Sequence, residues 1–531
     1  MTAASPSIPR AWLTACHPRW APAFLALGGI VPLLGLAAAW ASPQGALLLV
    51  AALAVAVLGI AALLLLVRRP WLAPWLVVPV FSLSGELRLR VSPQVGLAKD
   101  GILLLLVAVT TVIVWNNRSA VARRLRSYAA PLGALAVLVA LYLGDAAGAH
   151  RTPWLFGTRL LLSVLALLVI GMVAMEPLRW VRALVGALAV VLPVEALFAW
   201  AQQAAGIDRL VYRWGYAYGS QVRVTSDGGL RTSGTFEDPF QLAALAIIGL
   251  AVALFVARGR VAVLIGLSSV LVLGAASVRT TWIQAAILIL CLVIKRGFWK
   301  QAAVAGIVVG AAGLLVLATT TTSIRPGAPE EPLLLTLNGR SVAWANAVTG
   351  WGSLAYGNGV GALGIGSTRD STTVSAAPAY DPNSAPEALF AGDPAFLDSA
   401  YAQVLSDVGV VGVAALAAGF GGLSLAAYRR LRAHPGNGAA WAAGGLLVVS
   451  AVDWVGRASL ASFSTGYLTM FVIGVLVAAM GTGPHPRPDP GPVARPRRTT
   501  VRTRRTRRPM LVPTRAVHPE ATYAGRHRRT P

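Results

Sequence analysis

The chain has 531 residues, of which 56% are hydrophobic and only 12% are charged, and its mean hydropathy is +0.67. These values exclude an ordinary soluble domain and are typical of an integral membrane protein. The two cysteines, Cys16 and Cys291, lie far apart in the sequence, which argues against a disulfide framework or a cysteine-ligated metal site.

Apolar runs of about 20 residues, the length that crosses a bilayer, recur along the chain and predict an all-α membrane protein with about 12–14 spans. Residues 1–20 are the predicted cytoplasmic N-terminus. Most of the predicted spans lie within 21–318, and the last ones lie within 398–481. The predicted boundaries are 21–40, 45–67, 71–84, 101–115, 130–147, 157–175, 183–203, 239–257, 261–278, 282–295, 302–318, 398–427, 438–456 and 463–481.

Clusters of basic residues predict the orientation, because short cytoplasmic loops are enriched in Lys and Arg. Every cluster between the predicted spans falls on the same side as both termini, so both ends are predicted to be cytoplasmic. The clusters are Arg68 and Arg69; Arg118, Arg123, Arg124 and Arg126; Arg179 and Arg182; Arg258 and Arg260; Lys295, Arg296 and Lys300; and Arg429, Arg430 and Arg432.

Much of the formal net charge of +25 lies at the C-terminus. Residues 482–531 hold thirteen arginines against Asp489 and Glu520, with almost no large apolar residue. Such a segment cannot build a core and is predicted to be disordered. A solvated anchor beside anionic lipid headgroups explains it better than nucleic-acid binding. We therefore expect membrane lipids, and no nucleic acid, among the partners.

Two connections on the predicted outer side are long, at about 204–238 and 319–397. Loops of this length usually carry a function. No repeat of fixed period is present, so a simple duplicated transporter gains no support.

Three arginines stand on this outer side, where few basic residues are expected. Arg231 lies in GGLRTSGTFEDP, Arg279 in ASVRTTW between two closely spaced spans, and Arg340 in NGRSVAW. An arginine beside hydrocarbon must pair, extend to the headgroups or face a polar cavity. The polar neighbours of Arg279 favour a cavity.

Two aspartates open predicted spans. Asp238-Pro239 is typical of a helix start, with Asp as N-cap and Pro at the first helical position. Asp398 is either the N-cap of the next span or a functional carboxylate at its outer end, and Tyr401 lies on the same helical stripe.

Taken in order, these segments resemble the O-antigen ligase/polymerase family of bacterial membrane glycosyltransferases over residues 200–425. Family ligases place a histidine followed by asparagine where this chain has Asp398 and Ser399, and an aspartate is more like the polymerases. The matching features are Arg231 before a G-x-F segment (Gly234, Phe236), Arg279 near a span junction, R-x-x-x-W (Arg340, Trp344), a Gly-x-Gly-x-Gly turn (Gly357, Gly359, Gly361) and a helix ending at Gly409.

The resemblance implies a polyprenyl-diphosphate-linked glycan donor and a glycan acceptor at the outer face of the bacterial cytoplasmic membrane. A flippase and a chain-length regulator are further partners that it suggests. Since guanidinium groups bind diphosphate oxygens through paired hydrogen bonds, Arg231, Arg279 and Arg340 are expected to form a clamp. Asp398 is expected to orient or deprotonate the acceptor hydroxyl. The residues expected to contact substrate are Arg223, Glu237, Trp344 and Tyr401.

No D-x-D pair stands in the outer loops, so neither a metal nor another cofactor is expected. Two other functions stay open. A transporter or flippase of lipid-linked oligosaccharide needs polar groups near the bilayer midplane, for which Glu195 and Asp453 are candidates. A second membrane glycosyltransferase fold has an acidic site in its first outer loop, but that loop here is about ASPQ, without an acid.

Overall fold

The computed structural model describes residues 59–90, 98–145, 151–216, 218, 221–224, 229–298, 321–322, 331–332, 351–363, 399–460 and 465–481. All of them belong to the first of two compact units, Met1–Gly483; the second unit is Pro484–Pro531. The predicted site residues Arg340, Trp344 and Asp398 lie outside the described residues, as do the predicted spans 21–40 and 302–318 and the basic tail.

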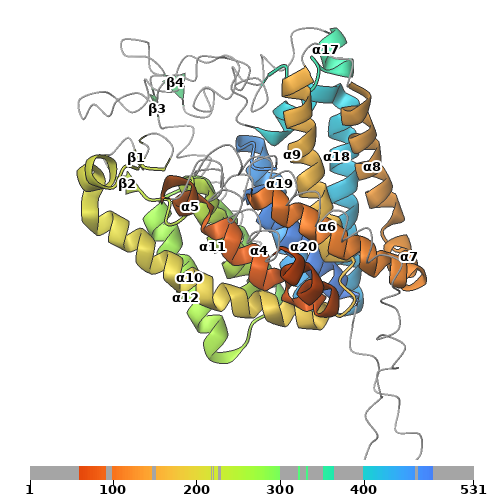
Figure 1. Ribbon diagram of the computed structural model, residues 1–531, viewed down its shortest axis with the longest axis horizontal. Coiled ribbons are helices and arrows are strands. Elements are labelled where there is room, and N and C mark those ends of the chain that lie inside the picture. Colours follow the sequence, from red (N-terminus) through yellow and green to blue (C-terminus); the bar gives the residue numbers. More distant parts are fainter. Residues whose placement is uncertain are drawn as a thin grey trace, which may run out of the picture. The chain divides into compact units, whose positions relative to one another are not determined.

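Helices dominate the part of the chain that the structure describes (Figure 1). Within it, six helices are long and apolar enough to cross a membrane, or eight if each of two bent pairs is one span. An all-α, multi-pass membrane protein is therefore confirmed, while the total of about 12–14 spans stays a prediction. The helices are α4 (Ala73–Ser82), α5 (Ser84–Arg90), α6 (Ala98–Asn116), α7 (Arg118–Arg126), α8 (Ala129–Gly144), α9 (Arg151–Met172), α10 (Pro177–Asp208), α11 (Pro239–Phe255), α12 (Gly259–Ala276), α13 (Arg279–Lys295), α17 (Trp351–Tyr356), α18 (Ala400–Ala433), α19 (Gly438–Gly456) and α20 (Thr465–Met480), with short turns η1 (Pro70–Leu72) and η4 (Arg209–Arg213).

Two antiparallel hairpins are the only paired strands among the described residues. In the first predicted outer loop, β1 (Arg223–Val224) pairs with β2 (Leu230–Arg231). In the second, β3 (Thr321–Thr322) pairs with β4 (Glu331–Pro332).

Two predicted spans begin with capping residues that the structure identifies. Asp238 caps α11 as predicted, since its Oδ1 accepts the N–H of Phe240 at 2.6 Å and Pro239 takes the first helical position. In α18, however, the cap is Ser399, whose Oγ accepts the N–H of Ala402 at 3.3 Å. Asp398, for which the sequence left capping and catalysis open, lies outside the described residues.

The predicted third span, 71–84, is too short to cross a bilayer alone. The helical segments Gly59–Arg68 and Pro70–Ser82 meet at 117°. Proline disfavours helical geometry in the residue before it, which explains a bend at Arg69. Residues Pro70–Ser82 cover only about two thirds of the length that a spanning helix needs.

α20 lies in the middle of the helix bundle, where every one of its residues except Thr469 is buried. Glycines allow its backbone to approach α9 closely. A Cβ atom on Gly474 would lie 2.2 Å from the carbonyl oxygen of Leu168, and one on Gly171 would lie 2.6 Å from that of Phe471. Small residues at such interfaces let membrane helices pack backbone against backbone.

The glycine turn predicted in the second outer loop packs on a break in α18. Val408 and Gly409 leave helical geometry, with φ of 71° at Gly409. A Cβ atom there would lie 2.3 Å from the carbonyl oxygen of Ala355, so the two backbones touch. The turn glycines all have positive φ, as a tight turn requires: Gly357 84°, Gly359 99° and Gly361 79°.

We expect Gly409→Ala to lower the melting temperature of the detergent-solubilised protein by several degrees. A residue with a Cβ atom in this conformation costs about 1–3 kcal/mol, and the contact with Ala355 adds to that. Gly421→Ala is the control, because it lies in the same helix with nothing within 4 Å of the new atom. Equal melting temperatures for both variants would contradict this account of the break.

Candidate functional site

Helix ends from distant parts of the sequence meet on the predicted outer side of the bundle. The carbonyl of Ala275, near the end of α12, accepts the N–H of Thr232 at 3.4 Å, and the carbonyl of Arg457, just after α19, accepts the N–H of Ala400 at 3.0 Å. We call this region the mouth. It comprises Arg223 and residues 229–240, 275–284, 399–403 and 453–460.

Side chains of α10 hold the irregular segment that carries Arg231. The buried amide of Gln202 binds both backbone groups of Gly234, donating to its carbonyl at 2.8 Å and accepting from its N–H at 2.9 Å. The amide of Gln203 donates to the carbonyls of Leu230 at 2.7 Å and Ala275 at 2.9 Å. The segment is thereby fixed against α10 and the end of α12.

Glu195, predicted as a candidate for transport, also serves this segment. Its side chain is buried and accepts hydrogen bonds from the backbone N–H of Thr235, at 3.0 Å, and from the Thr235 hydroxyl. A Cβ atom on Gly234 would lie 2.5 Å from Glu195 Oε2, and Gly234 has φ of 60°. Glycine at 234 is thus required both by backbone conformation and by space, which accounts for the G-x-F segment after Arg231.

Two predicted site arginines face each other across the first hairpin. Arg223 and Arg231 are directly paired in β1 and β2, so their side chains leave the hairpin on the same face. Like charges placed opposite one another destabilise a strand pair. Asp238 compensates the charge of Arg223, since its Oδ2 lies 3.0 Å from Nη2 of that arginine. The hairpin therefore concentrates positive charge beside the start of α11.

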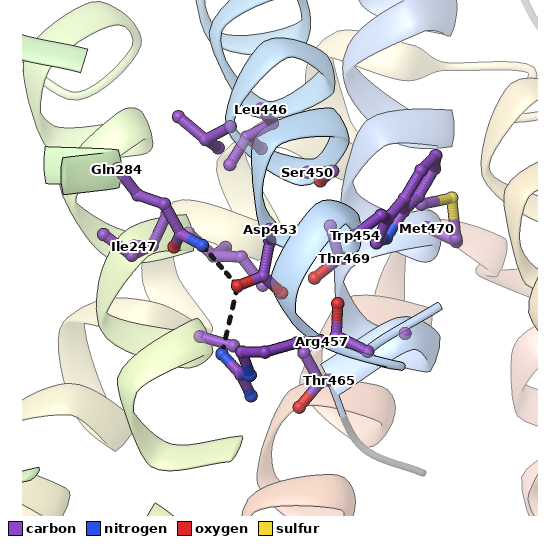
Figure 2. Close-up of a pocket in the computed structure, with 15 residues that line it drawn as sticks. Ile247, Gln284, Leu446, Ser450, Asp453, Trp454, Arg457, Thr465, Thr469 and Met470 are labelled. Carbon is purple, nitrogen blue, oxygen red and sulfur yellow. Dashed lines mark hydrogen bonds and ion pairs between the residues drawn. The ribbon is translucent and has the colours of Figure 1, made fainter. Parts of the chain in front are cut away.

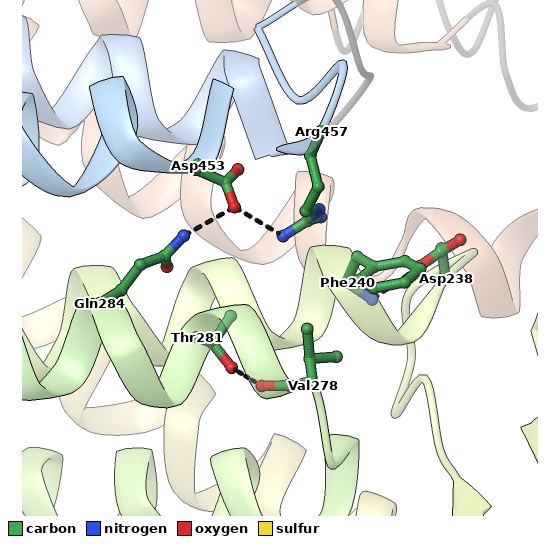
Figure 3. A network of polar contacts seen from close by, with 7 residues as sticks. All are labelled: Asp238, Phe240, Val278, Thr281, Gln284, Asp453 and Arg457. Atoms are coloured by element: carbon green, nitrogen blue, oxygen red, sulfur yellow. Dashed lines mark hydrogen bonds and ion pairs between the residues drawn. The ribbon is translucent and has the colours of Figure 1, made fainter. Parts of the chain in front are cut away.

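A second polar network joins α13 to α19 near Phe240, the second residue of α11 (Figure 3). Asp453 Oδ1 accepts from Gln284 Nε2 at 2.7 Å and from Arg457 Nη1 at 3.2 Å. Both ionic side chains are deeply buried, 7% exposed for Asp453 and 9% for Arg457. The Phe240 ring contacts Arg457 and also Arg223, with Cζ atoms 4.5 Å and 5.0 Å from its centroid. Two guanidinium groups therefore pack against one aromatic ring.

A small cavity adjoins this network (Figure 2). Its polar lining includes Gln284, Asp453, Arg457, Thr465 and Thr469, and its apolar lining includes Ile247, Leu446 and Met470. The volume of about 30 Å³ holds roughly two water molecules. A glycan does not fit there, so any large substrate has to lie in the mouth outside it.

Arg279 is the first residue of α13, and the connection from α12 consists of Ser277 and Val278 alone, as the near absence of a predicted loop implies. Ser277 makes this turn with a left-handed φ of 49°. The Arg279 side chain is exposed, and it is absent from the lining of two cavities in the described part of the chain. That Arg279 faces a substrate cavity stays a prediction.

Tyr401 and Glu237 lie at the edges of the mouth. The Tyr401 hydroxyl donates to the carbonyl of Ala451 at 3.3 Å, and its ring packs edge-on against Trp454 with centroids 6.1 Å apart. These contacts fasten α18 to α19. Glu237 is half-buried beside the Asp238 cap. The structure gives Tyr401 a packing role and leaves its predicted contact with substrate untested.

Sequence reasoning missed Arg457 and Asp407. The i, i+4 spacing of Asp453 and Arg457 was the available signal for the first, since such pairs meet on one helix face. Asp407 is buried in α18, where Tyr142 Oη donates to its Oδ2 at 2.8 Å and the Gly361 N–H donates to its Oδ1 at 3.2 Å. Nothing local in the sequence indicates these partners.

No cluster of three or more His, Cys, Asp or Glu suited to a metal occurs within the described residues.

No protein-family model matches the chain, and no curated protein matches it. The resemblance to the O-antigen ligase/polymerase family therefore depends on the sequence motifs alone.

We expect Gln202→Leu to loosen the segment around Gly234. The substitution keeps the side chain's approximate size but leaves the N–H and C=O of Gly234 without partners, at about 1–3 kcal/mol each. Hydrogen exchange at residues 230–236, measured by mass spectrometry, should accelerate. Gln202→Glu, which retains the acceptor for the Gly234 N–H, should show a smaller change. Unaltered exchange in Gln202→Leu would mean that other contacts hold the segment.

Proposed function

We propose that this chain is a bacterial membrane glycosyltransferase that acts on polyprenyl-diphosphate-linked oligosaccharides at the outer face of the cytoplasmic membrane. The observation that carries the proposal is the placement of Arg223 and Arg231 opposite each other at the mouth of an apolar bundle. Such a concentration of guanidinium groups suits a multiply charged phosphate ligand. The motif order described above supports the same class of substrate.

The proposed reaction transfers a glycan between two lipid-linked chains. The acceptor hydroxyl attacks the anomeric carbon of the donor, its proton passes to Asp398, and the bond from the anomeric carbon to the phosphate oxygen breaks. The electron pair of that bond stays on the polyprenyl diphosphate, which leaves. Arg231, Arg279 and Arg340 stabilise the negative charge that develops there, an effect that is large in a poorly hydrated site.

Polymerisation is favoured over ligation because the chain has Asp398 followed by Ser399 rather than the ligases' histidine and asparagine. Ser399 is itself a structural residue in this protein. It caps α18 and its Oγ donates to the carbonyl of Trp454 at 2.9 Å. The start of α18 is thus held at the mouth, directly after the proposed base.

A transporter or flippase of lipid-linked oligosaccharide is the second candidate. It is favoured by the buried carboxylate of Asp407 beside the break at Val408 and Gly409, since broken helices with polar groups form many transport sites. The carboxylate is, however, already bonded to Tyr142 and to the backbone N–H of Gly361, which suits a role in packing. Glu195 and Asp453 are likewise occupied by hydrogen bonds within the protein.

The transfer reaction should be measured on the purified, detergent-solubilised protein with short polyprenyl-diphosphate oligosaccharides. We expect a ladder of longer glycans from the wild type. Arg231→Ala, Arg340→Ala and Asp398→Ala should each slow it by at least about a hundredfold, the usual effect of removing one group that stabilises transition-state charge.

Arg213→Ala is the matched control for this assay, since Arg213 is an exposed arginine of the same outer loop as Arg231. It should retain the wild-type rate. A single-step product on an added acceptor would indicate ligation instead of polymerisation. Transport of the lipid-linked oligosaccharide across proteoliposomes, with no glycosidic bond formed, would favour the flippase. Transfer that survives all three site substitutions would rule out the proposed site.

Transfer should also survive chelation, because the proposed clamp consists of arginines and needs no metal to neutralise the diphosphate. The test compares the rate in EDTA with the rate in Mg²⁺ or Mn²⁺. Activity lost in EDTA and restored by either ion would overturn the metal-independent mechanism.

A further inference from the structure

We propose that Arg457 and Thr465 bind a phosphate group of the substrate, in addition to the arginines identified from the sequence. The inference deepens the proposed function, which supplies the identity of that phosphate as part of the donor's diphosphate. The contacts that point to an anion, however, come from the described residues around Phe240 and do not depend on the family resemblance.

The guanidinium of Arg457 is buried but largely unoccupied. It has five N–H bonds to donate. In the part of the chain that the structure describes, Asp453 is the only hydrogen-bond acceptor for this guanidinium, through Nη1 at 3.2 Å. The Phe240 ring supports the group at 4.5 Å without accepting a hydrogen bond in the plane of the guanidinium. Nε and Nη2 therefore remain available to a ligand.

Thr465 supplies a second, independent indication. It lines the same cavity as Arg457 (Figure 2) and is only 5% exposed. Its Oγ1 is buried and has no hydrogen-bond partner among the residues that the structure describes. Buried hydroxyls in folded proteins are nearly always paired, so an orphan of this kind needs a specific reason. An anionic oxygen placed between the hydroxyl and the guanidinium would satisfy both groups.

The arginines around Phe240 favour an anionic ligand. Three arginines take part in the contacts around Phe240 and the hairpin: Arg223, Arg231 and Arg457. Two carboxylates, Asp238 and Asp453, pair with the first and last of these. A phosphate adds charge and several acceptor oxygens with the geometry that guanidinium groups bind in pairs. A neutral sugar hydroxyl would accept hydrogen bonds from Arg457 but would bring no charge to it.

The proposal is tested by calorimetric titration of the full-length protein in detergent, with inorganic diphosphate and a short-chain prenyl diphosphate as probes. Arg457→Gln should weaken binding of the prenyl diphosphate at least about tenfold, as expected for lost charged hydrogen bonds, and Arg457→Lys should restore only part of it. Arg159→Gln is the control, since Arg159 pairs with Asp100 and packs on a different ring, Phe156. It should bind the probe like the wild type.

Thr465→Val keeps the test decisive where Arg457→Gln fails to fold. Valine removes an unpaired buried hydroxyl at nearly constant shape, so the melting temperature should stay the same or rise. Binding of the prenyl diphosphate should nevertheless fall several-fold. If Thr465 had only a structural role, its substitution would not weaken binding while leaving the melting temperature unchanged or higher. Wild-type affinity in both Thr465→Val and folded Arg457→Gln, or no binding to the wild type, would overturn the proposal.

The source of the phosphate is resolved by repeating the titration in nanodiscs of phosphatidylcholine with and without phosphatidylglycerol. Undiminished prenyl diphosphate binding supports the donor as the ligand. Displacement by phosphatidylglycerol that depends on Arg457 would overturn that assignment and make the site one for lipid headgroups. Binding that requires Arg457, without transfer of any oligosaccharide tested, would sustain the site while counting against the glycosyltransferase.

Discussion

The mouth depends on one constraint, which is that backbone outside a helix must find hydrogen-bond partners when it enters an apolar bundle. The segment from Leu230 to Thr235 meets this constraint through α10. Gln202 pairs with both backbone groups of Gly234, and Glu195 accepts the N–H of Thr235. Burying these polar side chains of α10 without partners would cost free energy. Here they are paired with the backbone of the loop that carries Arg231, and they hold that loop in place. The position of that arginine is a consequence of how its backbone is satisfied.

The ion pairs at the mouth orient the arginines more than they stabilise the fold. Burying an ion pair such as Asp453 and Arg457 costs desolvation that its attraction only roughly repays, while removing one partner alone is strongly destabilising. The same holds for the less buried pair of Arg223 and Asp238, whose carboxylate also caps α11. Each aspartate therefore fixes one guanidinium against Phe240. What these pairs supply is a set of donors already held in place, and pre-placed donors are what stabilises developing charge without reorganisation.

Local patterns in the sequence predicted local structure well. The span 438–456 coincides with α19, Asp238-Pro239 starts α11, and the glycine turn has the positive φ values that its composition requires. The sequence did not indicate contacts between residues far apart along the chain. Tyr142 and Asp407 are 265 residues apart, and Gln284 and Asp453 are 169 residues apart. Hydropathy assigns each helix to the membrane but does not say which helices are neighbours. A polar pair between two helices forms only if those helices pack together, so hydropathy cannot predict it. The cap of α18, Ser399, lies one residue from the predicted start of that span at 398, which is within the error of any predicted helix end.

α18 contacts both the glycine turn of the second predicted outer loop and the mouth. Its first residues are tied to the end of α19, through Ser399 on Trp454 and Ala400 on Arg457. About two helical turns further on, Asp407 receives the N–H of Gly361, and Gly409 opens the helix where the loop backbone touches it. The turn of the loop and the backbone of Arg457 are thus attached to the same short stretch of helix. A ligand that moved the start of α18 would therefore act on both attachments. The break at Gly409 separates these first turns from the rest of the helix, where Gly419 and Gly422 let α18 lie close against Leu135 and Pro131 of α8.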